Sequence, residues 1–208
     1  MKIRYYGHSC FGLIFADGTT IITDPFDGTT GYPLCTASCT AAACSHDHFD
    51  HNYTQSLTGE FVTLNKAGSY TVGGVKSEAM ESFHDDARGA LRGKNLLFRF
   101  EGDGIRIAHL GDLGHMPNAE QIEFLKGLDV VMLPVGGVYT IDTDQAEAVL
   151  DAIRPHTAIA MHFKAGKCAI PFATEEKFVR DMNAVRLPNE IEFTDVNDLP
   201  AAIVMDWA

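Results

Sequence analysis

A dense group of potential metal ligands occupies one short stretch of the chain. The run HDHFDH at positions 46–51 contains His46, His48, Asp50 and His51. Imidazole nitrogens and carboxylate oxygens are good ligands for borderline divalent metals. In an extended segment alternate side chains point the same way, so His46 and His48 can bind one ion while Asp50 and His51 turn toward a second. The spacing therefore predicts a site for two transition-metal ions, which can activate water for hydrolysis.

The pattern H-x-H-x-D-H resembles the metallo-β-lactamase fold superfamily, and the likeness extends beyond this run. The segments Gly7-His8-Ser9, 45–52 (SHDHFDHN), 109–115 (HLGDLGH) and 133–137 (LPVGG) resemble the small prokaryotic UlaG-like metal-dependent hydrolases. The resemblance implies an α/β protein, a four-layer αββα sandwich of two mixed sheets flanked by helices. It also implies a metal-dependent hydrolase, and it leaves the substrate open because one fold serves many substrates.

Seven positions match the metal ligands of this superfamily: His46, His48 and His84 for a first ion, Asp50, His51 and His162 for a second, and Asp112 as the bridge between them. The resemblance also implies that Asp50 orients the attacking water, so Asp50 and Asp112 are the candidate catalytic residues. Without the resemblance, each distant position has another interpretation. The acidic residues at 85 and 86 can act in place of His84, Asp112 can be a turn residue between glycines, and His162 can simply end a strand.

Three further residues are expected to support the ligands rather than bind metal. Asp24 matches a strand-end aspartate that orients the site in the superfamily. His8 and His109 are interpreted in the same way, since the resemblance already fills every ligand position.

Four residues are candidate substrate contacts: His115, Lys164, Arg92 and Tyr139. His115 follows the bridging aspartate, although a capping or solvent-facing role is an equal alternative. Basic side chains would bring positive charge to the mouth of an acidic protein, and Arg88, Lys94 and Lys167 are of the same kind. Such charge would suit an anionic substrate.

The expected cofactors are two divalent metal ions, with Zn²⁺ as the first choice and Mn²⁺, Fe²⁺ or Ni²⁺ as accepted substitutes. The expected substrate is a small phosphoester, lactone or amide. Two other functions stay open. One is a non-catalytic metal-binding or regulatory protein. The other is a di-iron redox centre, which needs a flavin domain that we expect this chain to lack.

Composition narrows the class of protein. The 208 residues are 46% hydrophobic and 21% charged, with a formal net charge of −12, which is ordinary for a globular protein but opposes binding to nucleic acid. No stretch has the length of apolar residues that a membrane span needs, and no signal-peptide pattern opens the chain, so we expect a cytoplasmic protein without a membrane partner. Five cysteines predict reduced thiols, with a metal cluster of Cys35, Cys39 and Cys44 as a weaker alternative.

The elements that must position the ligands are short strands at first. Alternating and apolar runs predict strands at 2–6, 10–16, 20–24, 61–64, 69–72, 75–83, 95–101 and 105–109, and an irregular surface loop at 25–44. The second half of the chain is predicted to alternate between strands and helices. Helices are predicted from the Asn118 cap to about 126, at 143–153 and at 174–183, and strands at 129–135, 157–161, 191–193 and 202–205. We expect one domain over residues 1–208.

Overall fold

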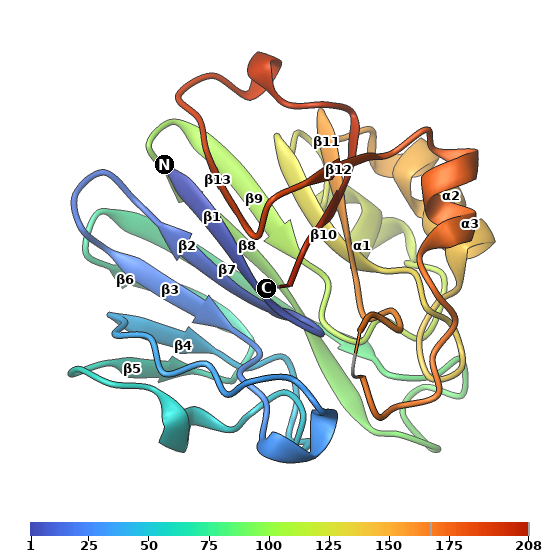
Figure 1. Ribbon diagram of the computed structural model, residues 1–208, viewed down its shortest axis with the longest axis horizontal. Coiled ribbons are helices and arrows are strands. Elements are labelled where there is room, and N and C mark those ends of the chain that lie inside the picture. The colour runs from blue at the N-terminus through green and yellow to red at the C-terminus, as the bar shows by residue number, and fades with distance from the viewer. Residues whose placement is uncertain (167, 208) are drawn as a thin grey trace.

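The computed structural model describes residues 1–166 and 168–207, which form two mixed β-sheets (Figure 1). The first sheet has six strands in the order β13-β1-β2-β3-β4-β5. Their bounds are β1 Lys2–Gly7, β2 Cys10–Ile14, β3 Thr20–Thr23, β4 Ala41–Ala43, β5 Val62–Leu64 and β13 Glu190–Glu192. β3, β4 and β5 pair in parallel, and the other neighbours pair antiparallel.

The second sheet has eight strands in the order β12-β14-β11-β10-β9-β8-β7-β6. Their bounds are β6 Gly68–Val72, β7 Val75–Phe83, β8 Lys94–Gly102, β9 Ile105–His109, β10 Val130–Pro134, β11 Thr157–Met161, β12 Val185–Leu187 and β14 Ala202–Met205. β6, β7, β8 and β9 form an antiparallel meander, and β9, β10, β11, β14 and β12 pair in parallel in that order. The two apolar runs that form β10 and β11 are buried at every position, as parallel central strands require.

The three α-helices of the described chain all contact the eight-stranded sheet. α1 (Ala119–Phe124) packs on β7, α2 (Thr143–Ile153) on β10 and α3 (Glu176–Asp181) on β14. α2 and α3 lie on the right of Figure 1, away from β3 to β5. Asn118 and Gln121 form the predicted capping box at the start of α1, and Asp142 and Gln145 form another at the start of α2. The predicted α/β sandwich of two mixed sheets is therefore confirmed.

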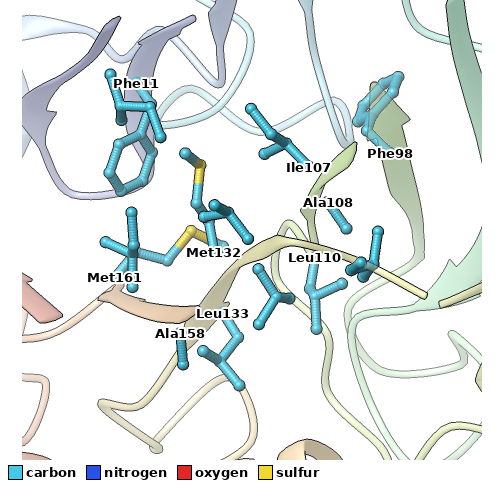
Figure 2. Close-up of a cluster of buried hydrophobic side chains, with 14 of the residues drawn as sticks. Phe11, Phe98, Ile107, Ala108, Leu110, Met132, Leu133, Ala158 and Met161 are labelled. Carbon is cyan, nitrogen blue, oxygen red and sulfur yellow. The ribbon is translucent and has the colours of Figure 1, made fainter. Parts of the chain in front are cut away.

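The core lies between the two sheets and continues beneath the helices. Phe11 of β2 faces the second sheet, where Met132 and Met161 lie near it, whereas Leu133 and Ala158 point to the opposite side of that sheet (Figure 2). Each of these side chains is at least 98% buried. Side chains that alternate along a strand point to opposite faces, so one strand serves both layers.

A different kind of layer covers the outer face of the six-stranded sheet. Phe26, Tyr32 and Cys35 of the segment 24–40 pack on Cys10 and Ile22 of the strands. The prediction of an irregular surface loop over 25–44 was therefore wrong at its end, which forms β4. Before β4 the segment is irregular apart from one short 3₁₀ turn, and it mixes buried side chains such as Phe26 and Tyr32 with exposed ones such as Leu34. Three alanines carry little strand propensity of their own, and they form a strand because β3 and β5 pair with them on both sides.

Other differences concern the ends of elements. Strand β12 (Val185–Leu187) was not predicted, because it has only three residues and is mostly exposed. Helix α3 is shorter than predicted by two residues at each end, and β13 pairs with β1 of the other sheet instead of joining its neighbours in sequence. No helix of the described residues has the length and apolar character needed to cross a membrane.

The C-terminal ends of six strands meet at one edge of the sandwich. β1, β3 and β4 of the first sheet and β7, β9 and β11 of the second run in the same direction within their sheets. Each of these strands is followed within two residues by part of the candidate site. In the same order as the strands, the parts are His8, Asp24, 45–51, His84, 110–112 and His162. Ligands of open α/β sheets bind at this end of the strands, so the fold presents one candidate site.

Candidate metal centre

Asp112 lies at the centre of a cluster of histidines. Its Oδ2 atom lies 3.1 Å from Nε2 of both His84 and His162, 3.2 Å from Nε2 of His51 and 3.9 Å from Nε2 of His46. The four rings follow three strands. His46 and His51 lie in the loop after β4, His84 follows β7 and His162 follows β11. This convergence of imidazoles on one buried carboxylate is what a bridging ligand between two metal ions requires.

One side of the cluster consists of three imidazoles, His46, His48 and His84. Their nitrogens lie within 4.8 Å of one another, and His46 Nε2 is 3.0 Å from His48 Nδ1. These are the three residues predicted to bind the first ion. The structure thus brings them together, although His84 comes from the opposite sheet.

The other side contains His8, His51 and His162, all buried, whose nitrogens also lie within 4.8 Å of one another. His8 Nε2 is 3.1 Å from His51 Nε2 and 3.3 Å from Asp50 Oδ2. His8 was expected only as a supporting residue. The structure places its ring as near to His51 as a fellow ligand would lie, so His8 either orients Asp50 or joins the ligands of the second ion.

The strained turn that carries His8 is held from two directions. Its backbone φ is +56°, in the left-handed region that non-glycine residues rarely adopt. The His8 carbonyl accepts hydrogen bonds from the Tyr5 hydroxyl (2.9 Å) and from the His162 backbone N–H (2.9 Å). The His8 ring stacks on Phe172, with centroids 5.6 Å apart. These contacts fix the imidazole without a metal ion.

Asp24 links both sides of the cluster. Its Oδ1 accepts from the Ser45 backbone N–H at 2.7 Å, and its Oδ2 contacts the Ser45 hydroxyl at 2.7 Å and His51 Nδ1 at 2.8 Å. Ser45 Oγ in turn lies 2.9 Å from His46 Nδ1. A carboxylate bound to the rear nitrogen of a ligand histidine fixes its orientation, so Asp24 holds one histidine directly and another through Ser45.

The loop that carries Asp112 is held by residues that the sequence did not single out. Asn95 accepts from the Asp112 backbone N–H at 2.9 Å and donates to the Leu110 carbonyl at 2.9 Å. Gly111 has φ +54°, and a Cβ there would lie 2.2 Å from Asn95 Oδ1, so only glycine fits. His109 contacts the Ser9 carbonyl through Nε2 at 2.8 Å and accepts from the Gly111 N–H, which agrees with its expected supporting position.

The electrostatics of the site favour bound positive charge. Burial opposes protonation of His51, yet Asp112, Asp24 and Asp50 together raise its pKa well above the usual value. Burial also opposes ionisation of Asp112, but His162 and His51 hold its pKa well below the usual value. Burial lowers the pKa of His8 to about 4 and, with His51, that of His46 far below the usual range. Neutral imidazoles and ionised carboxylates are the forms that bind metals, so His8, His46 and Asp112 are ready for a cation, whereas His51 holds a proton that a bound cation would displace.

These residues fit divalent metal ions. Nitrogen and carboxylate donors converge from several elements, and Asp112 Oδ1 is buried without a hydrogen-bond partner among the described residues. A buried acceptor without a partner is costly unless a cation or water satisfies it. In contrast, the groups of potential ligands in the described chain include no cysteine, and all five thiols are free and buried.

A cavity of about 330 Å³ opens beside the cluster. It is lined by His48, Phe49, Asp50, His84, Arg92, Asp112, Tyr139, His162 and Ile170. Two of the candidate substrate contacts, Arg92 and Tyr139, therefore border the site.

The other two candidates lie elsewhere. Lys164 lines a separate cavity with Trp207. His115 accepts from the Phe83 backbone N–H and contacts the Met116 carbonyl, so both its ring nitrogens have partners in the fold. Lys94 pairs with Glu81 at 2.7 Å, Arg88 is exposed, and Lys167 lies outside the described residues.

Comparison with known sequences gives the same picture. The sequence model of a beta-lactamase superfamily domain matches residues 2–162. A UPF0173 metal-dependent hydrolase of Thermoplasma acidophilum is 27% identical over 191 residues, covering 78% of this chain and 83% of that protein. A UPF0173 protein of Pyrococcus furiosus is 28% identical over 213 residues, covering 90% and 93%.

Solved structures share the architecture. A proposed zinc-dependent hydrolase of the metallo-β-lactamase superfamily from Thermotoga maritima has a TM-score of 0.83 and 35% identity, covering 98% of this chain and 97% of that one. Igni18, a metallo hydrolase of Ignicoccus hospitalis, has a TM-score of 0.62 at 21% identity, covering 88% and 90%. The second likeness concerns the fold alone.

Proposed function

This chain belongs to the metallo-β-lactamase superfamily and is a metal-dependent hydrolase, and on that premise we propose that it acts through two divalent metal ions, zinc first, on a small phosphoester, lactone or amide. The single observation that carries the proposal is the position of Asp112 Oδ2, within 3.2 Å of imidazoles from three different strand ends. One carboxylate shared by two histidine groups suits two adjacent ions.

Each ion has a set of residues in this proposal. His46, His48 and His84 would hold the first, Asp50, His51 and His162 would hold the second, and Asp112 would serve both. When bound, two divalent ions would lower the pKa of water and polarise the oxygen of the bond under attack.

The chain's own residues supply orientation and proton control. Asp50 borders the cavity, and its Oδ2 is held by His8 at 3.3 Å, which leaves the other oxygen to position the attacking water. Although burial opposes it, His51 and His8 keep the pKa of Asp50 well below the usual value, so the carboxylate is ionised at neutral pH. Asp24 and Ser45 prevent rotation of His51 and His46 during the reaction.

The test uses Asp50→Ala and Asp50→Asn in protein reconstituted with zinc. Hydrolysis of p-nitrophenyl esters and of a simple lactone should fall to background in both variants, while circular dichroism stays unchanged. Asp47→Ala is the matched control, since Asp47 lies in the same run but is exposed. Retained activity in the Asp50 variants would refute the assigned role.

The two other functions make different predictions. A metal-binding protein without catalysis would turn over none of these esters when two ions are bound. A di-iron centre would show a reversible redox change when loaded with iron, and we expect none.

A further inference from the structure

The loop after His84 is folded around a buried carboxylate. Asp85, only 2% exposed, accepts hydrogen bonds from the backbone N–H groups of four residues at 2.7–3.0 Å. These residues are Ala87, Gly89, Leu91 and Arg92. The position of Arg92 next to the metal centre is therefore fixed by its own backbone.

The Arg92 side chain lines the site cavity. Its guanidinium carbon lies 5.4 Å from the centroid of the Tyr139 ring, which comes from the loop between β10 and α2. Among residues 1–166 and 168–207, no carboxylate lies within 4.0 Å of this guanidinium, although the chain has 28 acidic residues. A half-buried arginine held by an aromatic ring, and left without an acidic partner, is available to an anion.

Apart from Arg92 and the candidate metal ligands, the cavity is lined by apolar and aromatic side chains. Phe49 lies between the ligands Asp50 and His48 and is 56% exposed, and Ile170 and Tyr139 line the same cavity. An exposed phenyl ring inside a metal-binding loop has no packing role in the core. It offers a surface for an apolar or aromatic group of a substrate.

We propose that the cavity takes phosphoesters with an aromatic or other apolar leaving group, and that Arg92 determines this preference by binding a phosphoryl oxygen. The inference rests on the proposed hydrolytic function and specifies its substrate class. A phosphoester carries its negative charge on the reacting group itself, so both the metal centre and Arg92 can reach that charge within about 330 Å³. The planar guanidinium donates two parallel hydrogen bonds to phosphate oxygens.

The reaction is a hydrolysis that balances without a further reactant. The water oxygen forms a new bond to phosphorus while the bond from phosphorus to the leaving oxygen breaks with its electron pair. One proton of the water ends on the leaving group or in solvent. Arg92 keeps its own proton throughout.

The experiment compares esters that share one leaving group and differ in charge. The zinc-loaded protein is assayed with bis(p-nitrophenyl) phosphate, which is anionic, and p-nitrophenyl acetate, which is neutral. We expect Arg92→Gln to raise KM for the phosphate by about 10- to 100-fold, the range for loss of charge-assisted hydrogen bonds, and to change KM for the acetate less than twofold. Arg92→Lys should recover part of the loss, since it keeps the charge but not the planar donor pair.

Arg88→Gln is the matched control, because Arg88 carries the same charge on the same loop but does not line the cavity. A second readout is independent of turnover. Phenylphosphonate, which is not hydrolysed, should bind the zinc-loaded protein in calorimetry, and Arg92→Gln should weaken this binding at least tenfold.

Four results separate this inference from the proposed function. Hydrolysis of the acetate without hydrolysis of the phosphate, or equal effects of Arg92→Gln on both, overturns the substrate class alone. Absence of phenylphosphonate binding overturns it as well. Two bound metal ions with no turnover of either ester counts against hydrolysis, whereas the phosphonate measurement still decides the role of Arg92.

Discussion

The two sides of the metal centre differ in how they are held. His48 is partly exposed, whereas His8 and His51 are fully buried. The buried side has contacts that exist without metal, including the stacking of His8 on Phe172 and the bond between His51 and Asp24. On the open side Ser45 holds His46, whereas the only ring contact of this kind that His48 makes among the described residues is with His46 itself. The comparison indicates that the fold shapes the buried side and His46, and that His48 depends most on the bound ion for its final position.

The largest effect is expected where the two sides meet. Asp112→Ala removes the carboxylate that both histidine groups share, so both ions should be lost and hydrolysis should fall to background. Metal content by mass spectrometry and steady-state kinetics measure this. Asp86→Ala, an exposed carboxylate near His84, is the control and should behave as wild type. A variant at Asp112 that retained two tightly bound ions would show that the sides are independent.

A smaller effect is expected from removing support on the buried side. Asp24→Asn keeps the shape of the side chain but loses the charge that orients His51 and, through Ser45, His46. Loss of such a supporting carboxylate lowers metal affinity by about 10- to 100-fold. Titration of zinc against a competing chelator measures the change. If affinity is unaltered, the packing of the rings alone orients them.

Protonation distinguishes the buried side in the metal-free protein. The pKa of His8 is about 4 in the folded chain and 6.5 in its ordinary state, because burial disfavours the charged ring. Between pH 6.5 and pH 4 the unfolded state binds more protons at His8 than the folded state does. The stability that comes from the neutral His8 ring is therefore fully present above pH 6.5 and is lost as the pH falls toward 4. At pH 5 the loss is about 2 kcal/mol.

When the pH falls from 7.5 to 5, the unfolding free energy of the metal-free protein should therefore decrease by about 2 kcal/mol less in His8→Asn than in wild type. Urea unfolding at the two pH values measures this difference. His156→Asn, at a residue away from the site, is the control. Parallel pH profiles for wild type and His8→Asn would contradict the buried neutral state of His8.

The smallest effect is expected at His115, which lies near the cluster in sequence but is bound to backbone groups. His115→Ala should cost about 1 kcal/mol of unfolding free energy, the usual size of one lost hydrogen bond, because its bond to the Phe83 N–H is partly buried whereas its bond to the Met116 carbonyl is exposed. Metal content should not change, and kcat/KM should stay within twofold of wild type. A large loss of kcat/KM at unchanged stability would restore His115 as a substrate contact.

Several features could be predicted because they depend on residues close in sequence. The types and spacing of the ligands at 46–51 predicted metal binding. The capping box of α1 follows from Asn118 and Gln121, which are three residues apart. The apolar runs of β10 and β11 predicted buried strands. By contrast, β4 could not be predicted from three alanines, since neighbouring strands created it.

The candidate site shows the same division. Resemblance pointed to His84, Asp112 and His162, but local pattern alone left each of them open to another interpretation. Asn95 and Phe172 gave no signal, because a lone asparagine in a strand and a phenylalanine in a loop have no distinctive spacing. Ser45 stood beside the ligand run and could have been noticed as a hydroxyl next to His46.

By itself the sequence determined the kind of chemistry, since the side chains at 46–51 can do little other than bind metal and their spacing is fixed by the covalent chain. The tertiary structure decided the rest. It placed His8 within 3.1 Å of His51, set Arg92 over Tyr139 and put the three α-helices of the described residues on one sheet. These relations join residues that are distant in sequence, and they arise only when the strand ends of two packed sheets meet at one edge.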